Sequence, residues 1–246
     1  MGRKKSSTFK KAVKAQKHFG PYSRWTKEAK DKTVKFEEAV QKQAKASITG
    51  FLGRGRNSVV FSLSNGNVLD ITDDKEEANN CATLKEKSLK NVVKIYDVFQ
   101  LGELPIYGIV RERVEPLSSK FEALCSRLFD FWSTSYFRQE TIKLGSTSKA
   151  FDYFKNNLSQ NNIKLDKLTG GEELVRPVLN GLLELATNNV TFIDITYDNI
   201  GKANDGAIKI FDIGYSKNSK VHIPTIDETK QFADLKLWVE SITTNG

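Results

Sequence analysis

The chain has few residues that could build a covalent or metal-bound framework. Its 246 residues include only two cysteines, Cys81 and Cys125, and two histidines, and no Cys-x-x-Cys spacing is present. A disulfide scaffold and a structural zinc site are therefore not expected, and both thiols are predicted to be buried in a reducing compartment. The sequence also lacks any run of about 18 apolar residues, the length that a membrane-spanning helix needs. We accordingly expect a cytoplasmic protein with no membrane contact.

Acidic residues are scarce near the N-terminus. Residues 1–50 contain 14 lysines and arginines but 4 aspartates and glutamates, whereas the remainder of the chain contains 24 and 26. No apolar region follows the first basic residues, so a secretory signal is not expected. The basic residues 1–19 have two interpretations, contact with nucleic acid or an acidic partner, or a solubilising tail. An apolar stripe over residues 24–46 predicts a helix that packs onto the following lobe.

The spacing of the apolar residues changes along the chain. With 39% apolar and 10% aromatic residues, the chain can bury a substantial core. Short β-branched runs separated by turn signals predict strands in the first half, and helical spacing beyond residue 118 predicts helices. The strands are expected within 48–63 and at 68–72, 92–99 and 106–110, with a helix over 74–90 that is capped by Asp73 or Asp74.

One stretch combines the polar residues most suited to catalysis. Phe192-Ile-Asp-Ile-Thr-Tyr-Asp-Asn199 precedes an apolar run that ends in Asp212. Asn204-Asp-Gly206 between them is a strong signal for a hairpin turn. The flanking strands would pair antiparallel and bring Asp194, Asn199 and Asp212 to one end of a small ribbon. Two carboxylates and an amide can there hold a hard cation and orient a hydroxyl nucleophile.

A glycine-rich turn lies in the predicted first strand pair. The pattern Gly53-x-Gly55-x-x-Ser58-x-Val60 places two glycines between strands. Glycine lets backbone amides approach phosphate oxygens closely, and Val60 would cover a base. Because a strand rather than a helix follows the turn, the pattern argues against a dinucleotide-binding fingerprint.

In order and spacing, these motifs resemble the protein-kinase-like superfamily over about residues 48–215. That family carries its catalytic and metal-binding residues in D-x-x-x-x-N and, after a short hairpin, in D-F-G. The resemblance implies an α+β, bilobal fold, with a small antiparallel β lobe at 48–113 and a reduced helical lobe at 114–246. Residues 1–47 would form a basic, helical N-terminal extension.

The resemblance also implies a role for each motif residue. Asp194 would orient the substrate hydroxyl and accept its proton, and Asn199 and Asp212 would bind Mg²⁺. ATP would lie between the lobes. Its predicted contacts are Gly53, Gly55, Ser58 and Val60 in the glycine-rich turn and backbone groups of Glu112 and Val114 in the connection between the lobes.

The chain departs from the family pattern around both motifs. The usual His-Arg before the catalytic aspartate is replaced by Phe192-Ile193, and the lysine common two residues after it is replaced by Thr196. Ile213 stands in place of the phenylalanine of D-F-G, which is a mild apolar exchange.

The largest departure is Asp70, which stands where the family has the lysine that holds the α- and β-phosphates. Unit charges about 4 Å apart interact by roughly 4 kcal/mol at an effective dielectric of about 20, so a carboxylate would repel phosphate strongly. Glu77 is expected to be the partner of the missing lysine, with Glu86 as the second candidate. Three explanations stay open: a deliberate inactivating substitution, which we favour; a natural pseudokinase; or charge supplied by Lys75 or Lys85.

The alternation of the third strand predicts where Asp70 points. Leu69 and Ile71 are expected either under the helix predicted at 74–90 or in the core of the lobe, with Asp70 on the opposite face. There it would lie beside Glu77 and toward Asp212. Repulsion among three acids would then raise the pKa of at least one of them.

The function that the resemblance implies is ATP- and Mg²⁺-dependent transfer of phosphate to serine or threonine hydroxyls of a protein, in a phage or bacterial setting. The location would be the bacterial or host cytoplasm. Two alternatives are a kinase of small molecules and a pseudokinase whose basic arm binds nucleic acid or an acidic host protein.

Overall fold

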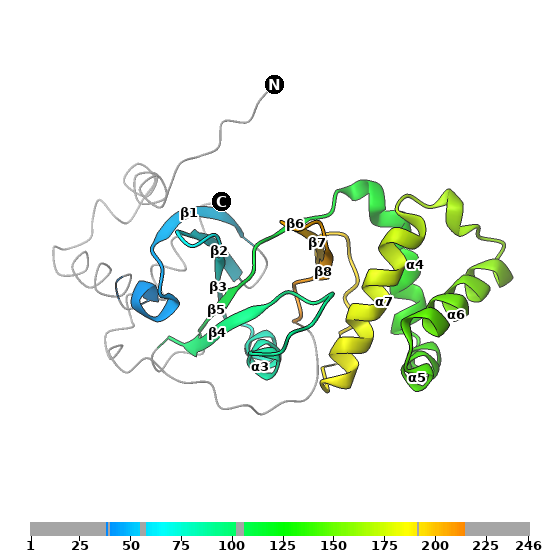
Figure 1. The fold of residues 1–246 in the computed structure, drawn as a ribbon, viewed down its shortest axis with the longest axis horizontal. Coiled ribbons are helices and arrows are strands. Elements are labelled where there is room, and N and C mark those ends of the chain that lie inside the picture. Colours follow the sequence, from blue (N-terminus) through cyan, green and yellow to red (C-terminus); the bar gives the residue numbers. More distant parts are fainter. Residues whose placement is uncertain (1–37, 39, 55–57, 102–105, 191, 215–246) are drawn as a thin grey trace, which may run out of the picture. The chain divides into compact units, whose positions relative to one another are not determined.

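The computed structural model describes residues 38–214 except 39, 55–57, 102–105 and 191 (Figure 1). The chain forms two compact units. The first unit contains the described residues up to Ala78 together with Tyr96–Arg111, and the second contains Asn79–Ile95 and the described residues from Glu112 onward. The predicted break after residue 113 lies two residues beyond the observed one, and residues 79–95 belong to the second unit. The predictions for residues 1–19 and for a final helix at 227–242 concern residues outside the described part.

The first unit is built on a five-stranded sheet in the order β1-β2-β3-β5-β4. Each of the pairs β1–β2, β2–β3 and β3–β5 is antiparallel, as expected from sequence. The turn before β3 contains Gly66, whose φ of 85° favours glycine. The strands are β1 (Ile48–Arg54), β2 (Ser58–Leu63), β3 (Val68–Thr72), β4 (Ile95–Gln100) and β5 (Tyr107–Arg111).

Side-chain alternation gives this sheet two different faces. One face packs into an apolar core with a helical stretch at 40–44, the described end of the helix predicted at 24–46. Leu69 and Ile71 lie in this core, as predicted. The cross-strand register places Val60 and Ile109 on either side of Asp70, so the other face carries a buried charge.

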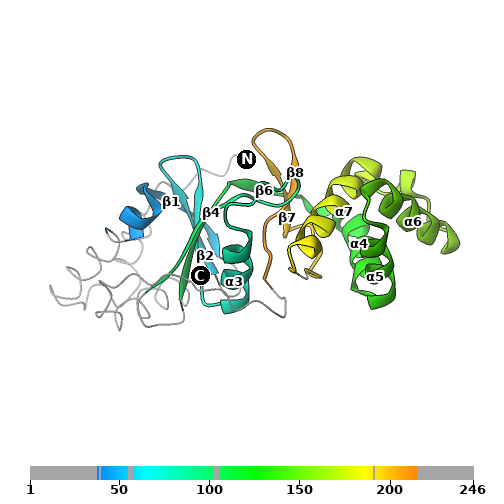
Figure 2. The same cartoon turned by 60° about the horizontal axis from the view of Figure 1, so that its bottom comes forward.

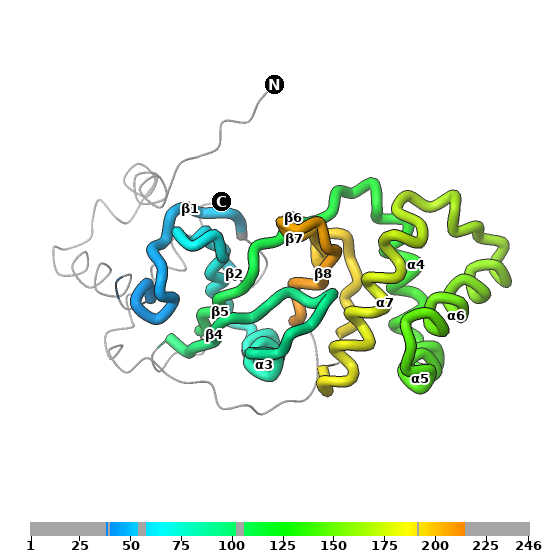
Figure 3. Tube along the Cα trace, in the orientation of Figure 1, coloured from blue at the N-terminus to red at the C-terminus, as the bar shows by residue number. Residues whose placement is uncertain are grey.

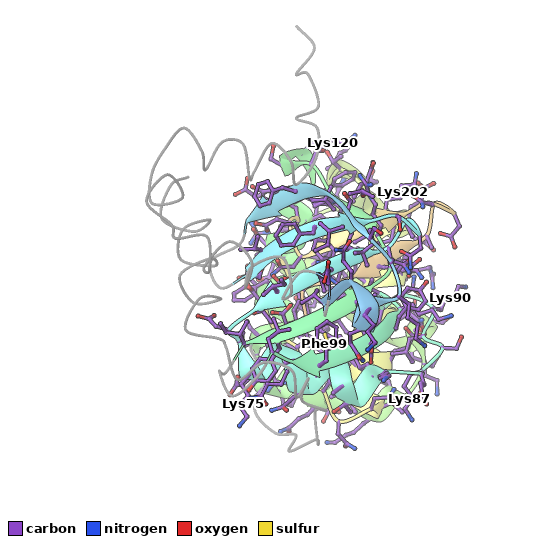
Figure 4. The ribbon with its side chains drawn as sticks, turned by 90° about the vertical axis from the view of Figure 1, so that its left-hand side faces the viewer. Lys75, Lys87, Lys90, Phe99, Lys120 and Lys202 are labelled. Atoms are coloured by element: carbon purple, nitrogen blue, oxygen red, sulfur yellow. The ribbon has the colours of Figure 1, made fainter. Side chains whose placement is uncertain are left out.

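Close packing also explains a glycine in β5. A β-carbon on Gly108 would overlap the ring of Phe99, which is buried on the neighbouring strand β4. Figure 4 labels Phe99 over the middle of the sheet and Lys75 at the margin of the same view. The Phe99 ring therefore fits at this point of the sheet because Gly108 on the neighbouring strand has no side chain.

The second unit is mainly helical, with a small antiparallel sheet of order β6-β7-β8. Apolar residues recur at helical spacing in α4, where Leu124, Leu128 and Trp132 are buried. The helices are α4 (Glu122–Ser133), α5 (Ser135–Leu144), α6 (Thr147–Gln160) and α7 (Gly171–Thr187), with 3-10 turns at Ser119–Phe121 and Leu165–Lys167 (Figure 2). The strands are β6 (Val114–Pro116), β7 (Ile200–Ala203) and β8 (Ile208–Ile210).

Two predicted elements are shorter than expected. The helix predicted at 74–90 is α3 (Lys75–Leu84), and Glu86 follows it with a φ of 69° that does not continue a helix. The strand predicted from Val92 begins at Ile95 instead, because Val92 forms a bridge with β8. The prediction that Glu86 belongs to this helix is therefore wrong. Among the helices that the structure describes, none has the length and apolar character required to cross a bilayer.

Candidate functional site

The antiparallel ribbon predicted around the turn Asn204-Asp-Gly206 is confirmed. Strands β7 and β8 pair antiparallel, with Ile200 opposite Ile210. The turn between them contains Gly206, whose φ of 87° suits glycine and whose amide donates to the Ala203 carbonyl at 2.9 Å. At the other end, the Phe211 amide donates to the Asn199 carbonyl at 3.1 Å. Asn199 therefore lies next to the segment that begins at residue 211.

The loop before the ribbon holds Asp194 in place. The Nδ2 of Asn199 donates to the carboxylate oxygen Oδ2 of Asp194 and to its backbone carbonyl, both at 3.0 Å. Trp132 in α4 braces the same loop, since its Nε1 donates to the Phe192 carbonyl at 2.7 Å. Asp194 itself is exposed, while Asn199 is buried. A fixed carboxylate that solvent can reach is suited to orienting a hydroxyl and accepting its proton.

Asp212 follows β8 by two residues and is exposed. Its Oδ1 accepts a long hydrogen bond from the Gly214 amide at 3.4 Å. The intervening Ile213 is buried, and its carbonyl accepts from Nδ2 of Asn80 at 2.8 Å. Asp212 thus lies between β8 and Ile213, a buried residue whose carbonyl is bonded to Asn80.

The residues at this end of the ribbon fit a Mg²⁺ ion chemically. Because both bonds from the Asn199 side chain leave through Nδ2, its Oδ1 is the atom that could bind a cation, alongside the Asp212 carboxylate. In the described part of the chain, no group of three or more His, Cys, Asp and Glu side chains gathers. Magnesium commonly takes one or two carboxylates and completes its shell with phosphates and water, so this small oxygen set is compatible with it.

A polar network that sequence reasoning missed connects α7 to β8. Glu184 accepts hydrogen bonds from the backbone amides of Lys90 and Asn91, both at 2.9 Å. The Asn180 side chain donates to Asn91 at 2.9 Å and to Glu184 at 3.0 Å. Asn91 in turn donates from Nδ2 to the Ile208 carbonyl at 2.7 Å. The available signal was a pair of polar residues, Asn180 and Glu184, four apart in the otherwise apolar stretch 178–186.

The same segment is fixed to β8 through the backbone. The Ile210 amide donates to the Asn91 carbonyl at 3.0 Å, and the Val93 amide donates to the Ile210 carbonyl at 2.8 Å. A β-carbon on Gly181 in α7 would lie 2.6 Å from that Asn91 carbonyl oxygen, so glycine is needed for the close approach. Figure 3 traces the chain from α7 into β7 and β8. Strand β8, which precedes Asp212, is therefore held from two directions.

In the first unit, Asp70 lies in surroundings that differ from the prediction. It is 3% exposed and forms an ion pair with Arg111 of β5, with 3.2 Å between Oδ2 and the guanidinium nitrogen. Burial raises the pKa of this carboxyl, although the charge of Arg111 and the hydroxyl of Ser58 act in the opposite direction. The predicted rise in the pKa of one of these acids is confirmed for Asp70. The predicted cause, repulsion among three acids, is wrong, because the rise comes from burial.

Three of the other residues predicted to contact ATP, Gly53, Ser58 and Val60, lie on β1 and β2. Among the described residues, no atom lies within 4 Å of a β-carbon built on Gly53. Ser58 and Val60 are half-buried, and Gly55 lies outside the described part of the chain. The backbone amide of Glu112 donates to Lys94, and Val114 lies in β6 opposite Ala203. Contact between adenine and these backbone groups stays a prediction.

Glu77 lies in the first turn of α3 and is buried. The helix is capped by Asp74, whose Oδ1 accepts from the amides of Glu76 at 2.8 Å and Glu77 at 3.1 Å, as one of the two predicted caps. Lys75 of the same helix is exposed. The helix therefore presents an acid to the interior and a lysine to solvent.

Both cysteines are buried, as predicted. Burial, together with the charge of Asp198, raises the pKa of the Cys125 thiol to about 11. That thiol is protonated at neutral pH and is not suited to nucleophilic catalysis.

Comparisons of the sequence with protein-family models and with curated proteins give no match.

Proposed function

We propose that the chain is a kinase-like protein of bilobal fold that binds ATP with Mg²⁺ and transfers phosphate to serine or threonine hydroxyls of a protein, in a phage or bacterial setting. The observation that carries this proposal is the hydrogen bond from Asn199 to Asp194 beside the start of the segment that contains Asp212. Asp194 would orient the hydroxyl and accept its proton. Asn199 and Asp212 would hold Mg²⁺, which neutralises charge on the transferring phosphate.

The proposed roles of Asp194 and Asp212 follow from the exposure of their side chains and from the contacts that hold them in place. Asp194 is exposed to an incoming hydroxyl, and its carboxylate is held by a neutral amide that does not compete for its proton. Asp212 is also exposed, and it follows a strand fixed by the network around Asn91. Positioned groups of this kind contribute to phosphoryl transfer chiefly by orientation and electrostatic stabilisation.

The ion pair in the first unit favours a second candidate, a natural pseudokinase. A lysine at position 70 would place a second cation beside the buried Arg111, whereas Asp70 gives that guanidinium a counter-charge. Asp70 and Arg111 are therefore matched, which argues that the aspartate belongs to the natural chain rather than to an inactivating substitution. A protein with such a pair could retain nucleotide binding and lack transfer.

The test combines binding and transfer on the full chain. Calorimetry with ATP, with and without Mg²⁺, should show Mg²⁺-dependent binding that Asp212→Asn removes and Asp194→Asn leaves in place. Incubation with labelled ATP and protein substrates should show transfer that Asp194→Asn abolishes, by about 10²–10⁴-fold for loss of a general base. Asp198→Asn, an exposed acid in the same loop, is the matched control and should change neither result.

Three outcomes separate the candidates. Mg²⁺-dependent binding with transfer supports the kinase, and binding without transfer supports the pseudokinase. Absence of nucleotide binding, in the natural chain and in variants at position 70 alike, would remove both.

A further inference from the structure

The loop that carries Asp194 contains no basic side chain. Residues 181–201 include no lysine, arginine or histidine, and Phe192-Ile193 stands where the protein-kinase-like superfamily has His-Arg. A cationic side chain of the loop itself therefore cannot fix the position of Asp194. The structure shows an anchor that comes from outside the loop, the indole of Trp132 in α4.

The contact between Trp132 and the loop is short and excludes water. The indole Nε1 donates to the Phe192 carbonyl at 2.7 Å, and the two residues are 2% and 1% exposed. Because a buried N–H and a buried carbonyl both need partners, this bond fixes the Phe192 peptide, which lies just before Asp194 in the chain. Asn199 holds Asp194 from the other side through two bonds of 3.0 Å. Asp194 thus lies between two anchors.

A second feature places α4 along the loop. Burial, together with the charge of Asp198, raises the pKa of the Cys125 thiol, so the Asp198 carboxylate lies near this part of α4. Cys125 and Trp132 are both buried and lie about two helical turns apart on one face of the helix. Phe192 and Asp198 belong to opposite ends of the loop. One face of α4 therefore approaches the loop near both of its ends.

Another face of α4 is packed against the neighbouring helices. Phe131 stacks on Phe137 of α5, with 5.2 Å between the ring centroids, and meets Phe154 of α6 edge-on at 5.1 Å. Figure 2 shows α4 beside α5 and α6. A helix that is fixed in this way gives the loop a rigid support, and precise placement of a catalytic group depends on such support.

We propose that Trp132 is a positioning residue for phosphoryl transfer, whose indole N–H holds the loop so that Asp194 meets the substrate hydroxyl in the reactive geometry. This inference rests on the proposed function and deepens it. Trp132 acts through the Phe192 peptide and touches no substrate. Misplacement of a reacting group by about 1 Å can cost about 10²-fold in rate, so loss of this one hydrogen bond should appear in kcat.

The sharpest test removes the N–H and keeps the ring. Trp132→benzothienylalanine, introduced into the full chain by stop-codon suppression, exchanges the indole N–H for sulfur at nearly constant shape. The kcat for transfer to a protein substrate should fall about 10–100-fold, and KM for ATP should stay unchanged. Trp132→5-fluorotryptophan keeps the N–H and is the matched control, which should retain the natural rate.

Two further variants separate positioning from stability. Phe131→Leu weakens the aromatic packing of the same helix without removing a bond to the loop, so it should lower stability and leave kcat unchanged. Trp132→benzothienylalanine combined with Asp194→Asn should lose no more residual transfer than Asp194→Asn alone, because residues that act as a unit are not additive. Additive losses, or an equal loss of kcat in Phe131→Leu, would contradict the positioning role.

Hydrogen exchange tests the support of the loop without any activity. The Thr196 amide donates to the Asp194 carbonyl at 3.1 Å, and the Asn199 amide donates to the Thr196 carbonyl at 3.2 Å. Both amides should exchange about tenfold faster or more in Trp132→benzothienylalanine, whereas amides in the middle of α6 should keep their natural rates.

The outcomes keep this inference apart from the proposed function. Unchanged exchange in the loop, or an unchanged kcat when the N–H is removed from a chain that transfers phosphate, would overturn the role of Trp132. Absence of both transfer and nucleotide binding in the natural chain would remove the proposed function instead. The exchange result alone would then decide whether Trp132 holds the loop.

Discussion

The two units surround their acidic residues in opposite ways. In the first, the side chain of Asp70 is 4% exposed and faces a cation, Arg111. In the second, Asp194 and Asp212 are exposed and accept hydrogen bonds from neutral donors. An acid of the first kind contributes to the stability of the fold, whereas acids of the second kind lie where solvent reaches them. Substitution of Asp70 is therefore expected to lower the stability of the fold more than substitution of Asp194 or Asp212.

A second ion pair sharpens this contrast. Glu112 and Lys209 of the second unit lie 2.7 Å apart, and Glu112 also accepts from the Lys94 amide at 3.1 Å. Their side chains are 22% and 11% exposed, so water still reaches them. The pair in the first unit is drier and its charged atoms lie farther apart, at 3.2 Å, which makes it the less favourable of the two by geometry.

The largest expected effect on stability comes from removing one partner, Arg111, from its buried ion pair with Asp70. Arg111→Met should lower the free energy of unfolding by about 3–5 kcal/mol, because it leaves a buried carboxylate without its counter-charge. Urea denaturation measures this change. Arg127→Met, which removes half of an exposed ion pair with Asp130, should change it by less than about 1 kcal/mol. Equal losses for the two variants would contradict the contrast between buried and exposed pairs.

An intermediate effect is expected in the second unit. Glu184→Gln replaces one of two acceptor oxygens by an amide group that cannot accept from backbone N–H, and it should cost about 1–3 kcal/mol. The exposed Glu172→Gln on the same helix is the matched control and should stay within about 1 kcal/mol. Hydrogen exchange at the Asn91 and Ile210 amides should accelerate in Glu184→Gln alone, which would show that the effect reaches β8.

A smaller effect is expected from pH. The raised pKa of Asp70 means that its ionised form disfavours the folded state. Its contribution is fully present below the unfolded value of about 3.8 and is lost as pH rises through the folded value. Unfolding free energy measured across this acidic range should therefore fall more with rising pH in the natural chain than in Asp70→Asn. Parallel curves would show that Asp70 does not titrate in this way.

The smallest effect on stability is expected at the exposed acids. Asp212→Asn should change the free energy of unfolding by less than about 0.5 kcal/mol, as for other surface substitutions. Under the proposed function the same change removes the Mg²⁺ dependence of nucleotide binding. A large loss of stability would place Asp212 with Asp70 as a structural acid.

Local signals in the sequence were sufficient for the ribbon and much of the sheet. Asn204-Asp-Gly206 fixed the hairpin because its turn chemistry is local, and alternation placed Leu69 and Ile71 correctly. The ion pair between Asp70 and Arg111 could not be predicted. It depends on β5 lying beside β3 in the sheet, although β4 comes between them in the sequence. The contacts of Asn91 likewise depend on tertiary packing.

Two predicted boundaries were wrong, one for a local reason and one for a long-range reason. Helix α3 ends at Leu84 because Glu86 adopts a conformation that the helical pattern does not reveal. Strand β4 begins late because β8, far along the chain, pairs with Val92. The start of β4 is thus set by a partner that is distant in sequence. The kinase-like assignment of the site residues stays a prediction.

The anchor between Asn80 and the carbonyl of Ile213 has a consequence for synthesis on the ribosome. The two residues are separated by 133 positions. At a translation rate of roughly 5–20 residues per second, Asn80 leaves the peptidyl-transfer centre roughly 7–27 s before its partner is made. Until then the buried side-chain amide of Asn80 lacks the Ile213 carbonyl, and the Asn91 segment has no β8 to bind. A nascent chain would therefore be open to chaperones over this interval, and it would complete the second unit only after the D-I-G segment emerges.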